Sequence, residues 1–245
     1  MTHQTALITG ASGGIGKAIV ATLSQMGVAV AMVSRSREKL EGARAELGSS
    51  GQNVLTIPCD VTDRAQVKAM VEHVLCQMKT IDIVICGAGV NVRQRSLRAL
   101  DPADWDQVIA TNLTGAFNVL HYVLPGMRER GSGLVIQLSS LSGLRANVIS
   151  GAAYSASKFA QSALGACIGR EERGRGIRST VIHAGEVNTG FLDARSDRPG
   201  GGNDSRRQMI VQPQDIADVV RFLIELPPRA HVPELVIKPT IDDFS

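Results

Sequence analysis

The residues best suited to chemistry are a tyrosine and a lysine four positions apart, Tyr154 and Lys158, in a segment rich in alanine and serine. If this segment is helical, the two side chains lie on the same face, because positions i and i+4 are neighbours on a helix. A nearby ammonium stabilises the phenolate and lowers a tyrosine pKa that is about 10 when unperturbed. Ser140 lies upstream of this pair, at the end of an apolar run. The pattern predicts a proton donor of tuned acidity, although solvated helix faces often show the same spacing.

The elements that must position these residues alternate along the chain, each apolar run of strand length being followed by a helical pattern. The runs show little internal alternation, which indicates strands buried on both faces, as in a parallel sheet between two helical layers. The expected strands are residues 6–10, 28–34, 53–59, 81–87, 133–140, 177–185 and 234–238. The expected helices are residues 15–27, 37–48, 63–78, a long one beginning near 101, about 151–173, and 213–226.

This alternation predicts an α/β fold with one domain over residues 1–245. We expect a doubly wound Rossmann fold, with about seven parallel strands flanked by helices on both faces. Two helix starts carry clear signals. Thr62 or Asp63 is expected to cap the helix over 63–78, and Asp101 followed by Pro102 is expected to begin the next one.

The composition is that of a globular protein: of 245 residues, 44% are apolar and 3% aromatic, and the formal net charge is +3. The charge is spread along the chain, so we expect no nucleic-acid partner, which would require a clustered basic face. No apolar run reaches the roughly 18 residues needed to cross a bilayer, and the first residues lack the pattern of a signal peptide. We therefore expect a cytoplasmic protein without a membrane partner.

The cysteines and histidines give no sign of a metal site. The four cysteines, Cys59, Cys76, Cys86 and Cys167, form no CxxC pair, and the histidines form no HExxH motif. We therefore expect reduced thiols and no bound metal.

A glycine-rich turn, TGASGGIG at residues 9–16, lies directly between the first expected strand and the first expected helix. Dinucleotide-binding turns occur in this context, because backbone N–H groups and the helix N-terminus bind a pyrophosphate. Gly10 would permit the tight turn, while Gly14 and Gly16 would allow close approach of the pyrophosphate and of helix to sheet. The spacing differs from the usual G-x-G-x2-G, and a generic strand-to-helix turn is the alternative.

With these motifs in this order, the chain resembles the short-chain dehydrogenases/reductases over about residues 5–240. The TGxxxGIG pattern, the Tyr154–Lys158 pair and Ser140 match motifs of that family, and Asn112 in TNLTG matches its fourth catalytic position. The resemblance implies that Tyr154 transfers a proton to or from a substrate oxygen that Ser140 holds. It implies that Lys158 lowers the tyrosine pKa and binds the nicotinamide ribose, and that Asn112 positions a water linking Lys158 to solvent.

The resemblance also implies a set of cofactor contacts. They are Gly10, Ser12, Gly13, Gly14, Ile15, Gly16, Ser34, Arg35, Asp60, Val61, Gly87, Ala88, Gly89, Tyr154, Lys158, Gly185, Val187 and Thr189. The chain departs from the family in two places. Cys86-Gly87 stands where the family has two asparagines, so an amide that ties the central strands together is missing. Ala184-Gly185 replaces the usual Pro-Gly, although Val187 and Thr189 keep their places.

The end of the second expected strand indicates which nicotinamide cofactor is bound. NAD-binding proteins of this type usually carry an acidic residue there, which accepts hydrogen bonds from the ribose 2′-hydroxyl. This chain has Ser34 followed by Arg35, with Arg37 close behind. A guanidinium can bind a 2′-phosphate in bidentate fashion, so we predict NADP(H). The alternative is that both arginines are solvated residues at a helix start.

We therefore predict an NADP(H)-dependent oxidoreductase that transfers a hydride between nicotinamide and a carbonyl or alcohol substrate. The alternatives are a 3-oxoacyl-carrier or CoA reductase and a non-catalytic NADP-binding regulator. The loop over 190–212, polar and glycine-rich, is expected to be mobile and to cover the substrate. Arginines in and near it suit either an anionic substrate or a solvated face balanced by aspartates, and we favour the second interpretation. They are Arg93, Arg95, Arg98, Arg195, Arg198, Arg206 and Arg207, and the aspartates are Asp193, Asp197 and Asp204.

Small residues on the expected helix over 151–173 would let another helix approach closely. They are Ala156, Ala160, Ala163, Ala166 and Cys167. In the family that the chain resembles, this helix and the one near 102–130 form the subunit interface. The resemblance therefore implies a homodimer or homotetramer.

Overall fold

A parallel seven-stranded sheet forms the centre of the molecule, with strand order β3-β2-β1-β4-β5-β6-β7. The computed structural model describes residues 4–193 and 204–242. The strands are β1 (Thr5–Thr9), β2 (Ala29–Ser34), β3 (Val54–Pro58), β4 (Ile83–Cys86), β5 (Gly133–Ser140), β6 (Ile177–Ala184) and β7 (Glu234–Ile237). The order reverses between β1 and β4, which creates the switch point where such sheets bind ligands. The predicted α/β architecture is confirmed, whereas its extent as one domain over residues 1–245 stays a prediction.

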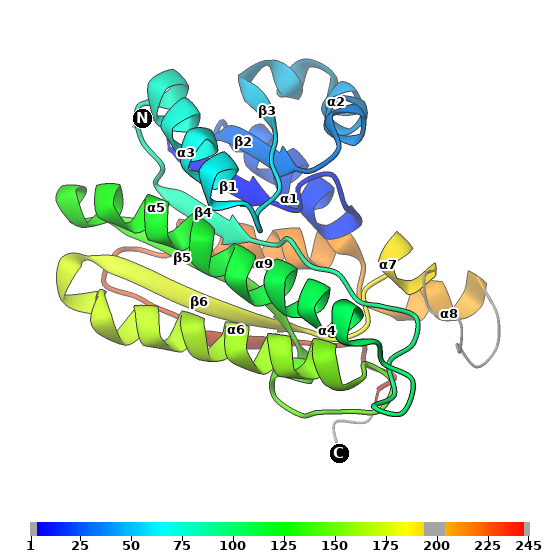
Figure 1. The fold of residues 1–245 in the computed structure, drawn as a ribbon. Helices are drawn as coiled ribbons and strands as arrows, with labels where there is room; N and C mark the ends of the chain where they lie inside the picture. Colours follow the sequence, from blue (N-terminus) through cyan, green and yellow to red (C-terminus); the bar gives the residue numbers. More distant parts are fainter. Residues whose placement is uncertain (1–3, 194–203, 243–245) are drawn as a thin grey trace.

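Helices cover both faces of the sheet (Figure 1). One face carries α1 (Gly14–Gln25), α2 (Arg37–Ala45) and α9 (Pro213–Glu225). The other face carries α3 (Arg64–Met78), α5 (Gly115–Arg130) and α6 (Ala152–Glu171), and α4 (Pro102–Ile109) precedes α5. Among the described residues, no helix is both long and apolar enough to cross a membrane.

Alternate strand residues supply two separate cores, and this explains the nearly continuous apolar runs of the sequence. In β1, Ala6 and Ile8 face the α1–α9 layer, while Leu7 faces the α3–α5 layer. Val84 and Cys86 of β4 likewise face the α3–α5 layer. Both sides of the sheet are therefore buried under helices.

The predicted helix starts are confirmed in detail. Asp63 is the N-cap of α3, because its carboxylate accepts hydrogen bonds from the backbone N–H groups of Ala65 and Gln66 at 2.9 and 3.1 Å. Asp101 caps α4 in the same way, with Pro102 as the first helical residue. Both caps satisfy backbone donors that a helix leaves unpaired at its N-terminus.

Two segments differ from expectation. The long helix expected from residue 101 is divided by a π-helical turn over Ala110–Thr114, which contains Asn112. Such turns are frequent at functional sites. The loop predicted over 190–212 contains two short helices, α7 (Gly190–Asp193) and α8 (Asp204–Met209). Residues 194–203 of the predicted mobile stretch lie outside the described residues.

Candidate active site

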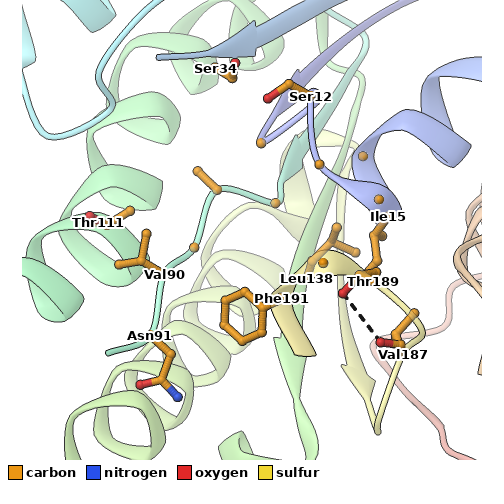
Figure 2. Close-up of a pocket in the computed structure, with 18 of the residues that line it drawn as sticks. Ser12, Ile15, Ser34, Val90, Asn91, Thr111, Leu138, Val187, Thr189 and Phe191 are labelled. Carbon is orange, nitrogen blue, oxygen red and sulfur yellow. Dashed lines mark hydrogen bonds between the residues drawn. The ribbon is translucent and has the colours of Figure 1, made fainter. Parts of the chain in front are cut away.

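A pocket of about 500 Å³ opens at the carboxyl ends of the strands, where the sheet reverses its order. This volume is in the range of small-molecule and cofactor sites. Every predicted cofactor contact lines it, as does Ser140, whereas Asn112 does not; its neighbour Thr111 does. Figure 2 shows Ser12 and Ser34 at one end of this pocket and Asn91 at the other, with the Phe191 ring between.

The glycine-rich turn fits against the neighbouring strand connection with no room for side chains. Gly10 has a φ of +71°, which favours glycine, and a Cβ on it would lie 2.6 Å from the carbonyl oxygen of Gly87. A Cβ on Gly16 would lie 2.3 Å from the carbonyl oxygen of Gly10. The backbone of this turn therefore forms the pocket wall, which is the surface that a pyrophosphate needs.

At the end of β2, the pocket is lined by Ser34, Arg35 and Lys39. The hydroxyl oxygen of Ser34 is buried, and within residues 4–193 and 204–242 no hydrogen-bond partner reaches it. An unpaired buried hydroxyl that lines a pocket fits a ligand hydroxyl or phosphate as its missing partner. Lys39 was not among the predicted contacts, although its position one helical turn after Arg35 could have indicated it.

Tyr154 and Lys158 lie on consecutive turns of α6, as the spacing predicts. The ammonium nitrogen of Lys158 is 5.7 Å from the centroid of the Tyr154 ring. Phe191, which was not among the predicted site residues, also lies against this tyrosine, with its ring centroid 5.9 Å from that of Tyr154. The tyrosine ring therefore has both a cation and an apolar ring as neighbours.

Lys158 is buried, with only 5% of its surface exposed. Its Nζ donates hydrogen bonds to the Leu138 carbonyl at 2.8 Å and to the side-chain carbonyl of Gln161 at 2.7 Å. Burial lowers the pKa of the Lys158 ammonium from its usual 10.5 to about 8, and Cys86 acts in the opposite direction. No carboxylate is among these neighbours, so the charge of Lys158 acts on Tyr154 without being neutralised.

Ser140 ends β5 beside this pair. Its hydroxyl accepts a hydrogen bond from the Ser142 N–H at 3.1 Å and so caps the turn that follows the strand. Its carbonyl oxygen lies 3.2 Å from Nδ1 of the buried His183, whose Nε2 contacts Glu234 at 2.5 Å. The strand end that carries the serine is therefore held from β6, and the hydroxyl keeps its own proton available for a substrate oxygen.

Asn112 lies behind the pocket, fully buried in the π-helical turn. Its side-chain oxygen accepts from the Val90 N–H at 2.7 Å, and its amide donates to the Val90 carbonyl and to the Ser157 hydroxyl, both at 3.0 Å. Both amide protons are thus used within the protein. Asn112 ties the strand connection after β4 to α6, and its predicted contact with a water stays a prediction.

The segment that departs from the family, Cys86-Gly87-Ala88-Gly89, is held by other groups. The Thr9 hydroxyl accepts hydrogen bonds from the N–H groups of Gly87 and Ala88 at 3.1 and 3.2 Å. The side-chain amide of Gln161 lies 3.4 Å from the Cys86 carbonyl. These contacts connect β4 to its neighbours where the usual asparagine amide is missing.

Three arginines near the pocket already have protein partners. Arg95 is buried and donates to the carbonyl oxygens of Val92 and Ile149, at 2.6 and 3.1 Å. Arg206 on α8 contacts Glu186 at 2.9 Å, and Arg207 contacts Asn188 at 3.4 Å. Arg93 and Arg98 are exposed, whereas Arg195, Arg198 and the side chains of the three aspartates lie outside the described residues. Arg95, Arg206 and Arg207 therefore bind groups of the protein itself, and their contacts do not point to an anionic substrate.

Comparisons with known proteins agree with this geometry. A family model described as short chain dehydrogenase matches residues 4–199. The 3-oxoacyl-[acyl-carrier-protein] reductase FabG of Staphylococcus aureus is 34% identical over 229 residues, which are 90% of each chain. Glycine betaine reductase ATRR of Emericella nidulans is 32% identical over 243 residues, which are 98% of this chain but only 19% of that protein.

Solved structures show the same fold. The alcohol dehydrogenase of the archaeon Thermococcus sibiricus, complexed with 5-hydroxy-NADP, is 29% identical with a TM-score of 0.86, and 99% of each chain is covered. A serine dehydrogenase complexed with NADP⁺ is 26% identical with a TM-score of 0.88, covering 99% of this chain and 97% of that one. With this fold, this pocket and these relatives, the chain belongs to the short-chain dehydrogenase family of oxidoreductases.

Proposed function

We propose that this protein is an NADP(H)-dependent oxidoreductase that interconverts a carbonyl and an alcohol. One observation carries the proposal: Tyr154, Lys158 and Ser140 line the same pocket as the glycine-rich turn and the Ser34–Arg35 strand end. A reactive tyrosine and a dinucleotide-shaped groove in one cavity suit hydride transfer beside a proton donor.

NADP(H), when bound, supplies or accepts the hydride. Charge develops on the substrate oxygen during reduction, and a donor must meet it. Tyr154 donates the phenolic proton to that oxygen in reduction and removes it in oxidation. The Ser140 hydroxyl donates a hydrogen bond to the same oxygen and orients it. Lys158 stabilises the phenolate through its charge, because it lies beside the ring in a buried site.

The groups at the end of β2 favour NADP(H) over NAD(H). Arg35 and Lys39 place two cations at the pocket edge beside the unpaired Ser34 hydroxyl, and no acidic residue occupies the end of this strand. Cations attract a 2′-phosphate, whereas a carboxylate would repel it. Structures of relatives complexed with NADP⁺ and with 5-hydroxy-NADP support this preference.

The proposal is tested by incubating the purified protein with NADPH or NADH and a panel of ketones, aldehydes and 3-oxoacyl thioesters. Stoichiometric loss of NADPH absorbance with alcohol formation is the expected result. Faster turnover with NADH would overturn the cofactor assignment. Tight NADPH binding without turnover of any carbonyl, or of alcohols with NADP⁺, would instead favour the non-catalytic regulator.

A 3-oxoacyl thioester is the more specific second candidate for the substrate. The 34% identity to a 3-oxoacyl-[acyl-carrier-protein] reductase supports it, whereas the arginines near the pocket add no support. In the panel, acetoacetyl-CoA tests this candidate directly. A kcat/KM for it below that of simple ketones would exclude it.

We also propose that the protein is a homo-oligomer assembled through α5 and α6. Two phenylalanines on these helices, Phe117 and Phe159, are 45% and 42% exposed, and Trp105 on α4 is 37% exposed. Large apolar side chains left exposed on these helices suit an interaction surface. Light scattering that gives a monomer mass at micromolar concentration would contradict this assembly.

A further inference from the structure

Two glutamines lie buried behind Lys158, on the side away from solvent. Gln161 belongs to α6 and Gln137 to β5, and neither has any exposed surface. The Lys158 ammonium donates to the Gln161 side-chain carbonyl at 2.7 Å, and the Gln161 amide donates to the Gln137 side-chain carbonyl at 3.0 Å. The three side chains form one hydrogen-bonded chain from the ammonium into the sheet.

The lysine determines the direction of both amides. An ammonium has donors only, so Gln161 must present its carbonyl to it and turn its NH₂ group toward Gln137. Gln137 must then present its carbonyl, which leaves its own NH₂ nitrogen buried with no partner in the part of the chain that the structure describes. A buried amide donor without a partner is unfavourable, and such a group in a native structure calls for an explanation.

We propose that Gln161, held in direction by Gln137, is a positioning residue for Lys158 in the proposed oxidoreductase reaction. Gln161 and the Leu138 carbonyl take up two of the three ammonium protons. The third proton is left for the pocket, which both Lys158 and Gly89 line. Nζ is close to Gly89 there, because a Cβ on that glycine would lie 3.8 Å from it. Gln161 thereby fixes where the ammonium lies relative to the Tyr154 ring.

Gln161 also keeps the ammonium charged. A neutral carbonyl bonded to a buried ammonium favours its protonated form against the cost of burial. Among the described residues, the titratable groups that face Lys158 are Tyr154 on its own helix and Cys86 on β4, and β5 presents the Leu138 carbonyl. Burial raises the pKa of Cys86 to about 12, so this thiol stays neutral through the pH range of an assay.

The competing interpretation is a purely structural tie between α6 and the sheet, since Gln161 also reaches the Cys86 carbonyl. The two interpretations differ in what they predict for pH. If Gln161 only connects α6 to the sheet, removing its hydrogen bonds lowers thermal stability at every pH. If Gln161 positions Lys158, removing it also shifts the pH at which that lysine titrates.

The test compares Gln161→Leu and Gln161→Glu with a matched control, Ser179→Ala. Ser179 is also buried and ties α6 to the sheet, through the Gly165 carbonyl at 2.8 Å, but it is not a partner of Lys158. The alkaline limb of the pH profile for carbonyl reduction is expected to move down by about one pH unit in Gln161→Leu and up in Gln161→Glu. At pH 7, kcat of Gln161→Leu should fall about tenfold, while Ser179→Ala should lose thermal stability alone.

A second readout requires no turnover. The ¹³Cε resonance of Lys158, assigned by its absence from Lys158→Met, is titrated in the cofactor-free protein. The same opposite shifts are expected in the two Gln161 variants. Unchanged titration in both, with only a lower melting temperature, would overturn the inference. If the wild-type protein turned over no substrate but the resonance shifted, the proposed function would fail while the positioning of Lys158 by Gln161 stood.

Discussion

The two ends of the pocket are built differently. Backbone lines the end formed by the glycine-rich turn. Side chains line the end formed by α6, and a buried polar network lies behind them. The first end requires a residue without a side chain at position 10, because a Cβ on Gly10 would collide with the Gly87 carbonyl. The second end depends on a charge kept in a buried place, on Lys158.

This difference indicates that the two ends respond to opposite kinds of substitution. Adding a single methyl group should disrupt the turn, while exchanging a charged or polar side chain for an apolar one of similar size should disrupt the α6 end. We expect the first change to act mainly on stability and cofactor binding. We expect the second to act mainly on turnover and pH dependence.

The largest effect is expected for Tyr154→Phe. The ring and its packing against Phe191 are retained, but the proton donor is lost. General acid–base catalysis contributes about 10²- to 10⁴-fold, so kcat should fall by that factor. The NADPH dissociation constant, measured by fluorescence titration, should change by less than about threefold, since the phenol adds one hydrogen bond at most. Full turnover in this variant would remove Tyr154 from the reaction.

Lys158→Met should alter how stability depends on pH. Burial lowers the pKa of Lys158 from 10.5 to about 8, so between these values the unfolded chain holds a proton that the folded chain has released. Stability contributed by the lysine is therefore fully present above pH 10.5 and is lost as the pH falls through about 8. The wild-type free energy of unfolding should rise relative to that of the variant by up to about 3 kcal/mol across this window. Denaturant titrations that give a constant difference would contradict the buried titration.

Gly10→Ala should cost more than a matched glycine substitution elsewhere. Gly27 also has a positive φ, +78°, but a Cβ on it would meet nothing within 4 Å. Gly27→Ala therefore isolates the conformational cost, which is about 1–2 kcal/mol. Gly10→Ala adds a collision with the Gly87 backbone, and we expect at least about 1 kcal/mol of further destabilisation together with weaker NADPH binding. Equal melting temperatures for the two variants would show that the turn can move away.

The smallest effect is expected for Arg35→Ser, because Arg35 is exposed and solvent screens its charge. The NADPH dissociation constant should rise about tenfold with that for NADH unchanged. Arg37→Ser provides the control, since Arg37 is an exposed neighbour that does not line the pocket. Equal losses of NADPH affinity in both variants would indicate a general charge effect and no specific 2′-phosphate contact.

Much of the fold and of both ends of the pocket could be predicted from local sequence. The strand and helix order, the Asp63 and Asp101 caps and the contacts around the glycine-rich turn depend on residues near one another in the chain. Tyr154 and Lys158 are neighbours on one helix, so their spacing alone placed them together. No local pattern predicted the π-helical turn that contains Asn112. Gly115, which follows this turn, packs against Val61, and a Cβ on Gly115 would lie 2.5 Å from the valine methyl group.

The sequence by itself determined the fold class, the family and the proximity of Tyr154 to Lys158, because each of these follows from patterns that repeat or act over a few residues. Only the tertiary structure decided what lies behind Lys158. Cys86 and Gln137 are partners in the β4–β5 register, and Gln161 reaches both from α6, although 75 residues separate it from Cys86 and 24 from Gln137. Contacts at such distances in the chain follow from strand register and helix packing, and no local pattern encodes them.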